Sequence, residues 1–247
     1  MNNRAKLLIT IIAAAIVAGG LLYMNKSSVA DKKQDHAEHS HHADESHIHS
    51  YSDDTATETL ETSGSVEDIP AGMNVYDIGS KDAPVTIIEY ASFSCSHCAD
   101  FHNNVFSDVE KALVRTGKAR FIFRDFPTNN PAYKATKLAH CVDQSRYIGM
   151  VKLLFKNRKS WAESTEIDTT LIQMGRLAGI DDQSYRACQT DETLDASLLE
   201  RFKEAQETYQ VKATPSFIFI SKDGRVEKFS GVRSVKAFEA VVDKLSK

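Results

Sequence analysis

Two cysteines separated by two residues, Cys95 and Cys98, have the clearest chemical potential in this 247-residue chain. Such a pair can close into a small disulfide ring when it lies at the first turn of a helix. The segment before it, 85–91, is apolar and β-prone, which predicts a buried strand. After it, apolar side chains recur at four-residue steps from Phe101 to Leu113, which predicts a helix. We therefore expect the pair in a loop between a strand and a helix.

Thiol–disulfide exchange needs a thiolate, and this position favours one. A free thiol has a pKa near ~8.5, but unpaired N–H groups and the helix dipole stabilise an anion at a helix N-terminus. A protonated His97 adds a cation in the same turn. We assign Cys95 as the exposed nucleophile with a lowered pKa, and Cys98, one turn deeper, as the resolving thiol. The alternatives are a structural disulfide or half of a zinc site, but no second CxxC or histidine pair has a suitable spacing in the folded part.

A strand, a short loop and a CxxC at the start of a helix form the redox motif of the thioredoxin-like fold. The surrounding sequence resembles the DsbA-type thiol:disulfide oxidoreductases, in particular their monomeric branch in alphaproteobacteria and some Gram-positive bacteria. The resemblance covers about residues 73–247, nearly all of the predicted folded domain. The segments that carry it are 87–98, 121–127, 214–217 and 223–224.

The resemblance implies roles for three residues outside the cysteine pair. Pro215 matches the family's cis-proline, which faces the disulfide and leaves the backbone of Thr214 free to pair with a substrate strand. Glu89 matches the family's buried acid, which exchanges protons with the Cys98 thiol and has a pKa raised by desolvation. Alternatively, Glu89 faces outward from its strand and His97 is a solvated loop residue.

Two positions depart from the best-known members of the family. Ser96 stands where they have a proline, and Thr214 replaces the valine that often precedes their cis-proline. These residues tune the redox potential and the choice of partner.

The other two cysteines, Cys141 and Cys188, are left for each other if Cys95 pairs with Cys98. The resemblance supports this pairing, because some alphaproteobacterial members carry a second, structural disulfide in this region. The alternative is two buried free thiols.

The N-terminal residues 1–30 read as a signal peptide or a signal anchor. Arg4 and Lys6 precede an uncharged apolar run at 7–24, and small residues at 28–30 favour cleavage. Positive charges before the run place the rest of the chain outside the cytoplasm, so we expect a periplasmic protein with membrane contact only through this segment. The net charge is −4 and basic residues are scattered, which gives no indication of nucleic-acid binding.

Residues 31–72 are expected to form a disordered acidic linker. The stretch 31–66 contains few large apolar side chains, so it cannot bury enough surface to offset the entropy of ordering. It holds six of the nine histidines, and such a tract can chelate Zn²⁺ or Cu²⁺, although a solvated linker is the simpler interpretation. These histidines are His36, His39, His41, His42, His47 and His49.

Residues 73–247 predict an α/β domain, a thioredoxin-like fold with an inserted helical subdomain at about 130–206. Strands are expected at 85–91, 119–125, 216–221 and 225–229, with helices at 96–116 and 234–245. His102 and His140 are expected to be surface or helix histidines.

Together these features predict a thiol:disulfide oxidoreductase that introduces disulfide bonds into exported proteins. Its partners are unfolded or reduced exported proteins and a membrane protein that reoxidises the pair, because the chain has no flavin or quinone motif. No cofactor is expected. A disulfide isomerase or reductase is one alternative. A metal-binding protein acting through the histidine tract is the other.

Overall fold

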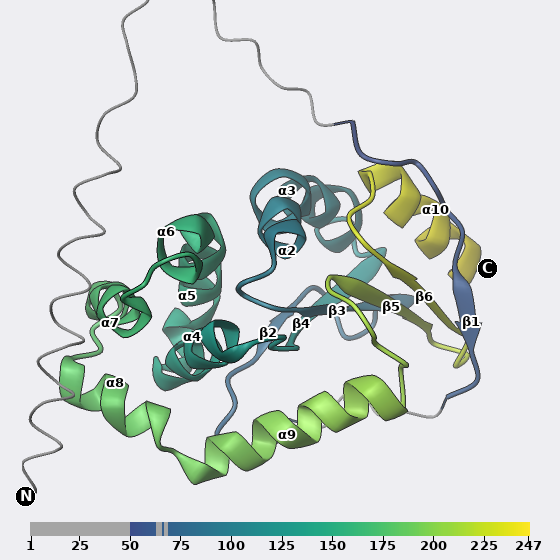
Figure 1. Ribbon diagram of the computed structural model, residues 1–247. Coiled ribbons are helices and arrows are strands. Elements are labelled where there is room, and N and C mark those ends of the chain that lie inside the picture. The colour runs from purple at the N-terminus through teal and green to yellow at the C-terminus, as the bar shows by residue number, and fades with distance from the viewer. Residues whose placement is uncertain (1–49, 63–65, 67–68) are drawn as a thin grey trace, which may run out of the picture. The chain divides into compact units, whose positions relative to one another are not determined.

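A mixed six-stranded sheet is the centre of the fold (Figure 1). The structure is a computed structural model that describes residues 50–62, 66 and 69–247. The strand order is β1-β6-β5-β3-β4-β2; β3 and β4 are parallel, and the other neighbours are antiparallel. The strands are β1 (Glu58–Leu60), β2 (Tyr76–Ile78), β3 (Val85–Ala91), β4 (Ala119–Asp125), β5 (Ser216–Ser221) and β6 (Val226–Ser230).

The three central strands, β3, β4 and β5, are buried along almost their whole length. Each contains a central run of β-branched and aromatic residues, as expected for strands covered on both faces. Their bounds coincide with those predicted from the sequence. They form a rigid base for the loop that carries Cys95.

Helices cover both faces of this sheet (Figure 1). On one face the core includes side chains from the helices that follow Cys95, from α5 and from α10; on the other it includes side chains near the end of α9. The helices from α4 to α9 lie between β4 and β5 in the chain, where the inserted helical subdomain was predicted, so the predicted fold class is confirmed. They are α4 (Asn130–Cys141), α5 (Gln144–Lys156), α6 (Arg158–Ala162), α7 (Ile167–Leu177), α8 (Asp182–Gln189) and α9 (Glu192–Glu207); α10 (Val235–Leu245) follows β6.

The helical segment after Cys95 is less regular than predicted. Instead of one α-helix over 96–116, it consists of α2 (Ser96–Asp100), a π-helical turn η1 (Phe101–Val105), α3 (Phe106–Val109) and a second π-helical turn η2 (Glu110–Val114). Apolar periodicity cannot distinguish these turns, since the same face remains buried throughout. Such π-helical turns often occur at functional sites.

The predicted disordered linker over 31–72 is wrong for its C-terminal part. Residues 50–60, which we call the N-terminal strap, are part of the folded domain: Ser52 forms a β-bridge with Arg233, and β1 pairs with β6. The Tyr51 hydroxyl donates to Asp100 Oδ1 at 2.9 Å. Composition missed the strap because backbone pairing and a few side chains, among them Tyr51 and the buried Leu60, hold it, whereas the prediction relied on the overall scarcity of large apolar side chains.

The predicted signal segment at 1–30 and the six histidines of the linker lie outside the described residues. Within the described ranges, none of the helices is long and apolar enough to cross a membrane.

Candidate active site

Cys95 lies between the buried end of β3 and the first turn of α2. It is the N-cap residue of α2, with extended backbone angles, and its Sγ accepts a hydrogen bond from the Cys98 backbone N–H at 3.4 Å. This is the arrangement that caps a helix start with an acceptor side chain. Cys95 is half-buried, whereas Cys98 is fully buried, and both are free thiols.

The loop that precedes β5 lies against Cys95 from a distant part of the chain. The Thr214–Pro215 peptide bond is cis, as the family resemblance implied. The Cys95 thiol donates to the carbonyl oxygen of Thr214 at 3.4 Å. The structure therefore places both segments predicted for the site at one point, although 119 positions separate Cys95 from Thr214.

The two thiols have opposite pKa shifts. A hydrogen bond with the Cys98 side chain is the main cause that lowers the pKa of Cys95 to about 5, and contacts with Thr214 and the backbone of Cys98 and His97 add to it, against the opposing effect of burial. The pKa of Cys98 is raised well above its ordinary value, first by burial and then by Cys95 and Glu89. At neutral pH, one thiol is a ready nucleophile and the other holds its proton.

Glu89 is fully buried in the middle of β3, so it does not face outward. Its Oε2 atom is 2.8 Å from His102 Nε2, while Oε1 has no hydrogen-bond partner among the described residues. Burial raises the pKa of Glu89, and the charge of His102 partly offsets the rise. The carboxyl group therefore has a pKa closer to neutral pH than a solvated glutamate.

His102, on η1, is the residue of this site that the sequence analysis missed. Its side chain is 3% exposed, and its ring stacks on Phe155 with centroids 4.2 Å apart and an interplanar angle of 9°. A usable signal existed, because His102 follows the buried Cys98 by four positions and such residues share a helix face. The prediction of a surface or helix histidine holds only for the helix: His102 lies in η1, and its side chain is buried rather than on the surface.

His97 is exposed on α2. Its backbone contributes to the lowered pKa of Cys95, through a hydrogen bond. The effect of its side chain on Cys95 remains a prediction.

His140, predicted as a surface or helix histidine, lies on the helix α4 and is buried. Its Nε2 lies 2.7 Å from Asp125 Oδ2, and its Nδ1 accepts the backbone N–H of Asn74 at 3.0 Å. The next residue, Cys141, forms a disulfide with Cys188, with Cα atoms 6.1 Å apart, which joins α4 to α8. These groups stabilise the helical subdomain beside the sheet.

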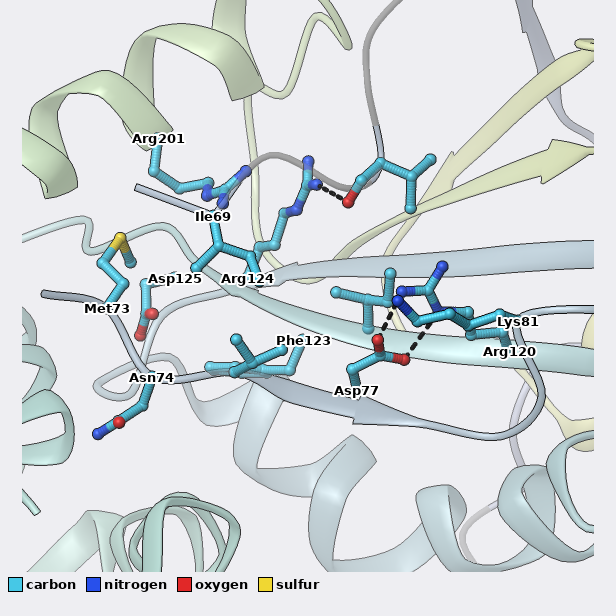
Figure 2. A pocket seen from close by; sticks show the side chains of 13 residues that line it. Ile69, Met73, Asn74, Asp77, Lys81, Arg120, Phe123, Arg124, Asp125 and Arg201 are labelled. Atoms are coloured by element: carbon cyan, nitrogen blue, oxygen red, sulfur yellow. Dashed lines mark hydrogen bonds and ion pairs between the residues drawn. The ribbon is translucent and has the colours of Figure 1, made fainter. Parts of the chain in front are cut away.

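A separate cavity lies along β2 and β4 (Figure 2). Several charged side chains line it, and two of its arginines bind groups of its own wall. Arg120 donates to both oxygens of Asp77 at 2.8 and 2.5 Å, and Arg124 donates to the Val66 carbonyl at 2.9 Å. Neither redox thiol lines this cavity, so it adds nothing to the chemistry of Cys95.

The described residues contain no group of three or more histidine, cysteine or acidic side chains arranged to hold a metal ion. The histidine tract predicted as a metal ligand lies outside these residues, so that hypothesis remains a prediction.

A fold with a CxxC at a helix start and a cis-proline opposite it defines a thioredoxin-like thiol protein. The family model described as "Thioredoxin" matches residues 71–244. Wolbachia pipientis alpha-DsbA1 is 30% identical over 70% of this chain and 91% of its own, with a TM-score of 0.61. The chain therefore belongs to the thioredoxin family, among its DsbA-type members.

Other relatives are more distant. Bacillus subtilis BdbD in its oxidised form shares the fold, with a TM-score of 0.62 at 16% identity over 76% of this chain and 98% of its own. A Rickettsia bellii protein assigned as a protein-disulfide oxidoreductase is 25% identical over 68% of this chain and 62% of its own length. The chain thus spans less than two thirds of that curated relative.

Proposed function

We propose that the protein is a thiol:disulfide oxidoreductase that introduces disulfide bonds into exported proteins through Cys95 and Cys98. The observation that carries this proposal is the placement of the two thiols: half-buried Cys95 caps α2 against the cis Thr214–Pro215 bond, whereas Cys98 is fully buried. This placement lowers the pKa of Cys95 to about 5 and raises that of Cys98 well above its ordinary value. A stabilised thiolate favours the reduced form, which makes the disulfide a stronger oxidant. This argues for an oxidase rather than a reductase.

The reaction begins with the disulfide form of the protein. A substrate thiolate attacks the Cys95 sulfur, the Cys95–Cys98 bond breaks, and Cys98 leaves as a thiolate that takes a proton from Glu89. A second substrate thiolate then attacks the substrate sulfur of the mixed disulfide. The substrate disulfide forms, Cys95 leaves as a stabilised thiolate, and two electrons have passed to the protein.

Substrate binding is assigned to the loop that ends in the cis-proline. The backbone of Thr214 lies within hydrogen-bond distance of Cys95, so an extended substrate paired with this residue would have its cysteine close to the reacting sulfur. Pro215 has no N–H and leaves the next backbone position without a competing donor. We assign Thr214 and Pro215 as substrate-binding residues on this basis.

The partners follow from the direction of electron flow. Reduced or unfolded exported proteins supply the electrons, and a membrane redox partner accepts them. The apolar run at 7–24 with preceding positive charges supports export to the periplasm, through a cleaved signal peptide or a retained anchor.

The proposal is tested with single-cysteine variants and a redox titration. Cys95→Ala should abolish oxidation of a reduced model protein, whereas Cys98→Ala should accumulate mixed disulfides through Cys95. Equilibration with glutathione should give a potential well above the thioredoxin value of about −270 mV. Equal activity of both alanine variants would contradict the assigned roles, and a potential at or below the thioredoxin value would favour a reductase.

A further inference from the structure

Glu89 and His102 form a buried carboxylate–imidazole pair, and Glu89 interacts electrostatically with the two redox thiols. Glu89 raises the pKa of Cys98, and the negative charge of Cys95 contributes to the raised pKa of Glu89. Among the residues that the structure describes, only one of the two carboxyl oxygens, Oε2, has a hydrogen-bond partner, which is His102 Nε2 at 2.8 Å. Oε1 remains available for proton exchange.

Aromatic rings from three elements enclose this pair. His102 stacks on Phe155 of the helical subdomain, and its ring lies 5.3 Å from Phe106 and 5.8 Å from Phe123, measured between centroids. The side chains of Glu89 and His102 are 0% and 3% exposed. An apolar enclosure of this kind penalises an isolated charge, so the protonation of either group depends on the other.

Few other titratable groups face Glu89. Tyr76 of β2 interacts electrostatically with it, and burial raises the pKa of Tyr76 far above neutral pH, so this phenol stays protonated. On the side of α2, the facing groups are Cys95 and Cys98. The proton balance at neutral pH is therefore set by the two thiols, Glu89 and His102.

We propose that His102 is a positioning residue that fixes Glu89 Oε2 and makes the Glu89–His102 pair the proton store for Cys98. The inference rests on the proposed function and names a further residue for the same site. One proton added to a carboxylate and a neutral imidazole makes the pair neutral overall, as a carboxyl beside an imidazole or as a carboxylate beside an imidazolium. When the pair gives this proton to the leaving Cys98 thiolate, the negative charge passes to the Glu89 carboxylate, which stays hydrogen-bonded to the neutral His102 ring.

In the reverse step, Cys98 displaces a thiol that is bound to Cys95, and the pair must accept the Cys98 proton. In a mixed disulfide at Cys95, the Cys98 thiol loses its proton to the Glu89 carboxylate, and the Cys98 thiolate attacks the Cys95 sulfur. The Cys95–Cys98 bond forms while the bond from Cys95 to the bound thiol breaks, and that thiol leaves as a thiolate. No other oxidant or reductant is needed for this internal step.

The test measures this internal step in the full chain, with glutathione as the bound thiol. Reduced protein is mixed with oxidised glutathione, and release of glutathione by Cys98 is followed from pH 4 to 9. His102→Gln keeps a neutral hydrogen-bond donor but removes the titrating ring. His140→Gln is the matched control, because His140 forms the same kind of buried pair, with Asp125, outside the site. Glu89→Gln removes the proton acceptor.

In His102→Gln, the inflection of the pH–rate profile should move upward, because the carboxylate loses a partner whose charge lowers its pKa. The rate on the acidic side of the inflection should fall with it, tenfold for each pH unit of the upward move. His140→Gln should keep the wild-type inflection, and Glu89→Gln should lose it.

Two results would overturn the inference. The first is an inflection in His102→Gln that is unchanged or moves equally in His140→Gln, because His102 would then be structural. The second is a wild-type profile that persists in Glu89→Gln, because the proton would then bypass the pair. In both cases, glutathione release shows that Cys95–Cys98 exchange survives, so the proposed function is judged separately.

If His102→Gln does not fold, the wild-type protein still decides the question. The side-chain carboxyl carbon of Glu89 is titrated by NMR in the reduced and oxidised forms, and the Nε2 signal of His102 is followed over the same pH range. The midpoint of Glu89 should differ between the two forms, since the charge of Cys95 acts on Glu89, and the His102 signal should change together with it because Nε2 is hydrogen-bonded to Oε2. An identical midpoint in both forms would overturn the inference.

Discussion

At the scale of single residues, two identical thiols have pKa values shifted in opposite directions because of their places on one helical turn. Cys95 caps α2 and is half-exposed, whereas Cys98 is fully buried three positions later. The sequence predicted the low pKa of Cys95 from its place at a helix start. It could not predict the main cause, a hydrogen bond with the Cys98 side chain, because this depends on how the two thiols are oriented within the turn. Nor could it predict the contact with Thr214, which depends on packing between distant segments.

The lowered pKa predicts a pH dependence for the reduced protein. Alkylation of Cys95 by iodoacetamide should reach half its limiting rate near pH 5, while Cys98 stays unreactive. Because the folded pKa lies below that of the unfolded chain, ionisation stabilises the folded form. This contribution is complete above about pH 8.5, the value for a free thiol, and is lost as pH falls through 5.

Unfolding in urea should therefore show the reduced protein gaining stability relative to the oxidised protein between pH 5 and 8.5. The oxidised protein is the natural control, because it has no thiol at position 95. Reduced Cys95→Ser should lack the gain. Equal pH profiles for the reduced and oxidised wild-type proteins would contradict the lowered pKa.

The histidines show which features of single residues could not be predicted from the sequence. His97 attracted attention because it lies between the two cysteines, yet it is exposed. His102 and His140 lie on helices and looked unremarkable, yet both are buried against carboxylates. Single residues on a helix do not reveal which strand faces them, so Glu89 could be identified as a candidate acid while its partner could not.

At the scale of elements, the central strands and the closing helix were predictable because each is a clear apolar pattern. The short strands β1 and β2, of three residues each, were missed, since three residues carry no recognisable period. The π-helical turn η1 was missed for a related reason: it changes the hydrogen bonding but keeps Phe101 and Val105 buried.

The disulfide between α4 and α8 leads to a prediction at the same scale. Cys141 and Cys188 are separated by 47 positions, and closing such a loop is worth about 4 kcal/mol in the chain-entropy model. The double variant Cys141→Ala/Cys188→Ala should lose a comparable free energy of unfolding and keep most of its exchange activity. Urea unfolding and turnover of a model substrate measure the two effects.

Thiol counting provides the control for that prediction. Unreduced, denatured wild-type protein should show neither Cys141 nor Cys188 as a free thiol. Finding two free thiols there, with Cys95–Cys98 oxidised, would contradict the structural disulfide.

At the scale of the whole molecule, the N-terminal strap extends the folded domain well before residue 73. It contacts α2 through Tyr51, meets Arg233 through Ser52, and adds β1 to the sheet. Leu60, in β1, is buried. The domain that must be kept intact in any truncated form therefore begins near residue 50.

Two truncations test the strap. A chain starting at residue 50 should keep the thermal stability of the longer chain, whereas one starting at residue 62 should melt about 4–8 °C lower. The estimate corresponds to burial of one leucine, about 2 kcal/mol, and to about 2–4 °C per kcal/mol in a domain of this size. Equal melting temperatures for the two truncations, measured by circular dichroism, would show that the strap contributes nothing to stability.

The short outer strands have a consequence for how the protein meets unfolded chains. Both edges of the sheet are strands of only three residues, β1 and β2. A long open edge is a template on which any extended chain can add a strand, which would be a hazard for a protein whose proposed clients are unfolded. Because its edge strands are this short, the sheet offers such chains few backbone groups to pair with. A client is then held mainly by the covalent bond to Cys95, which is broken when the reaction ends.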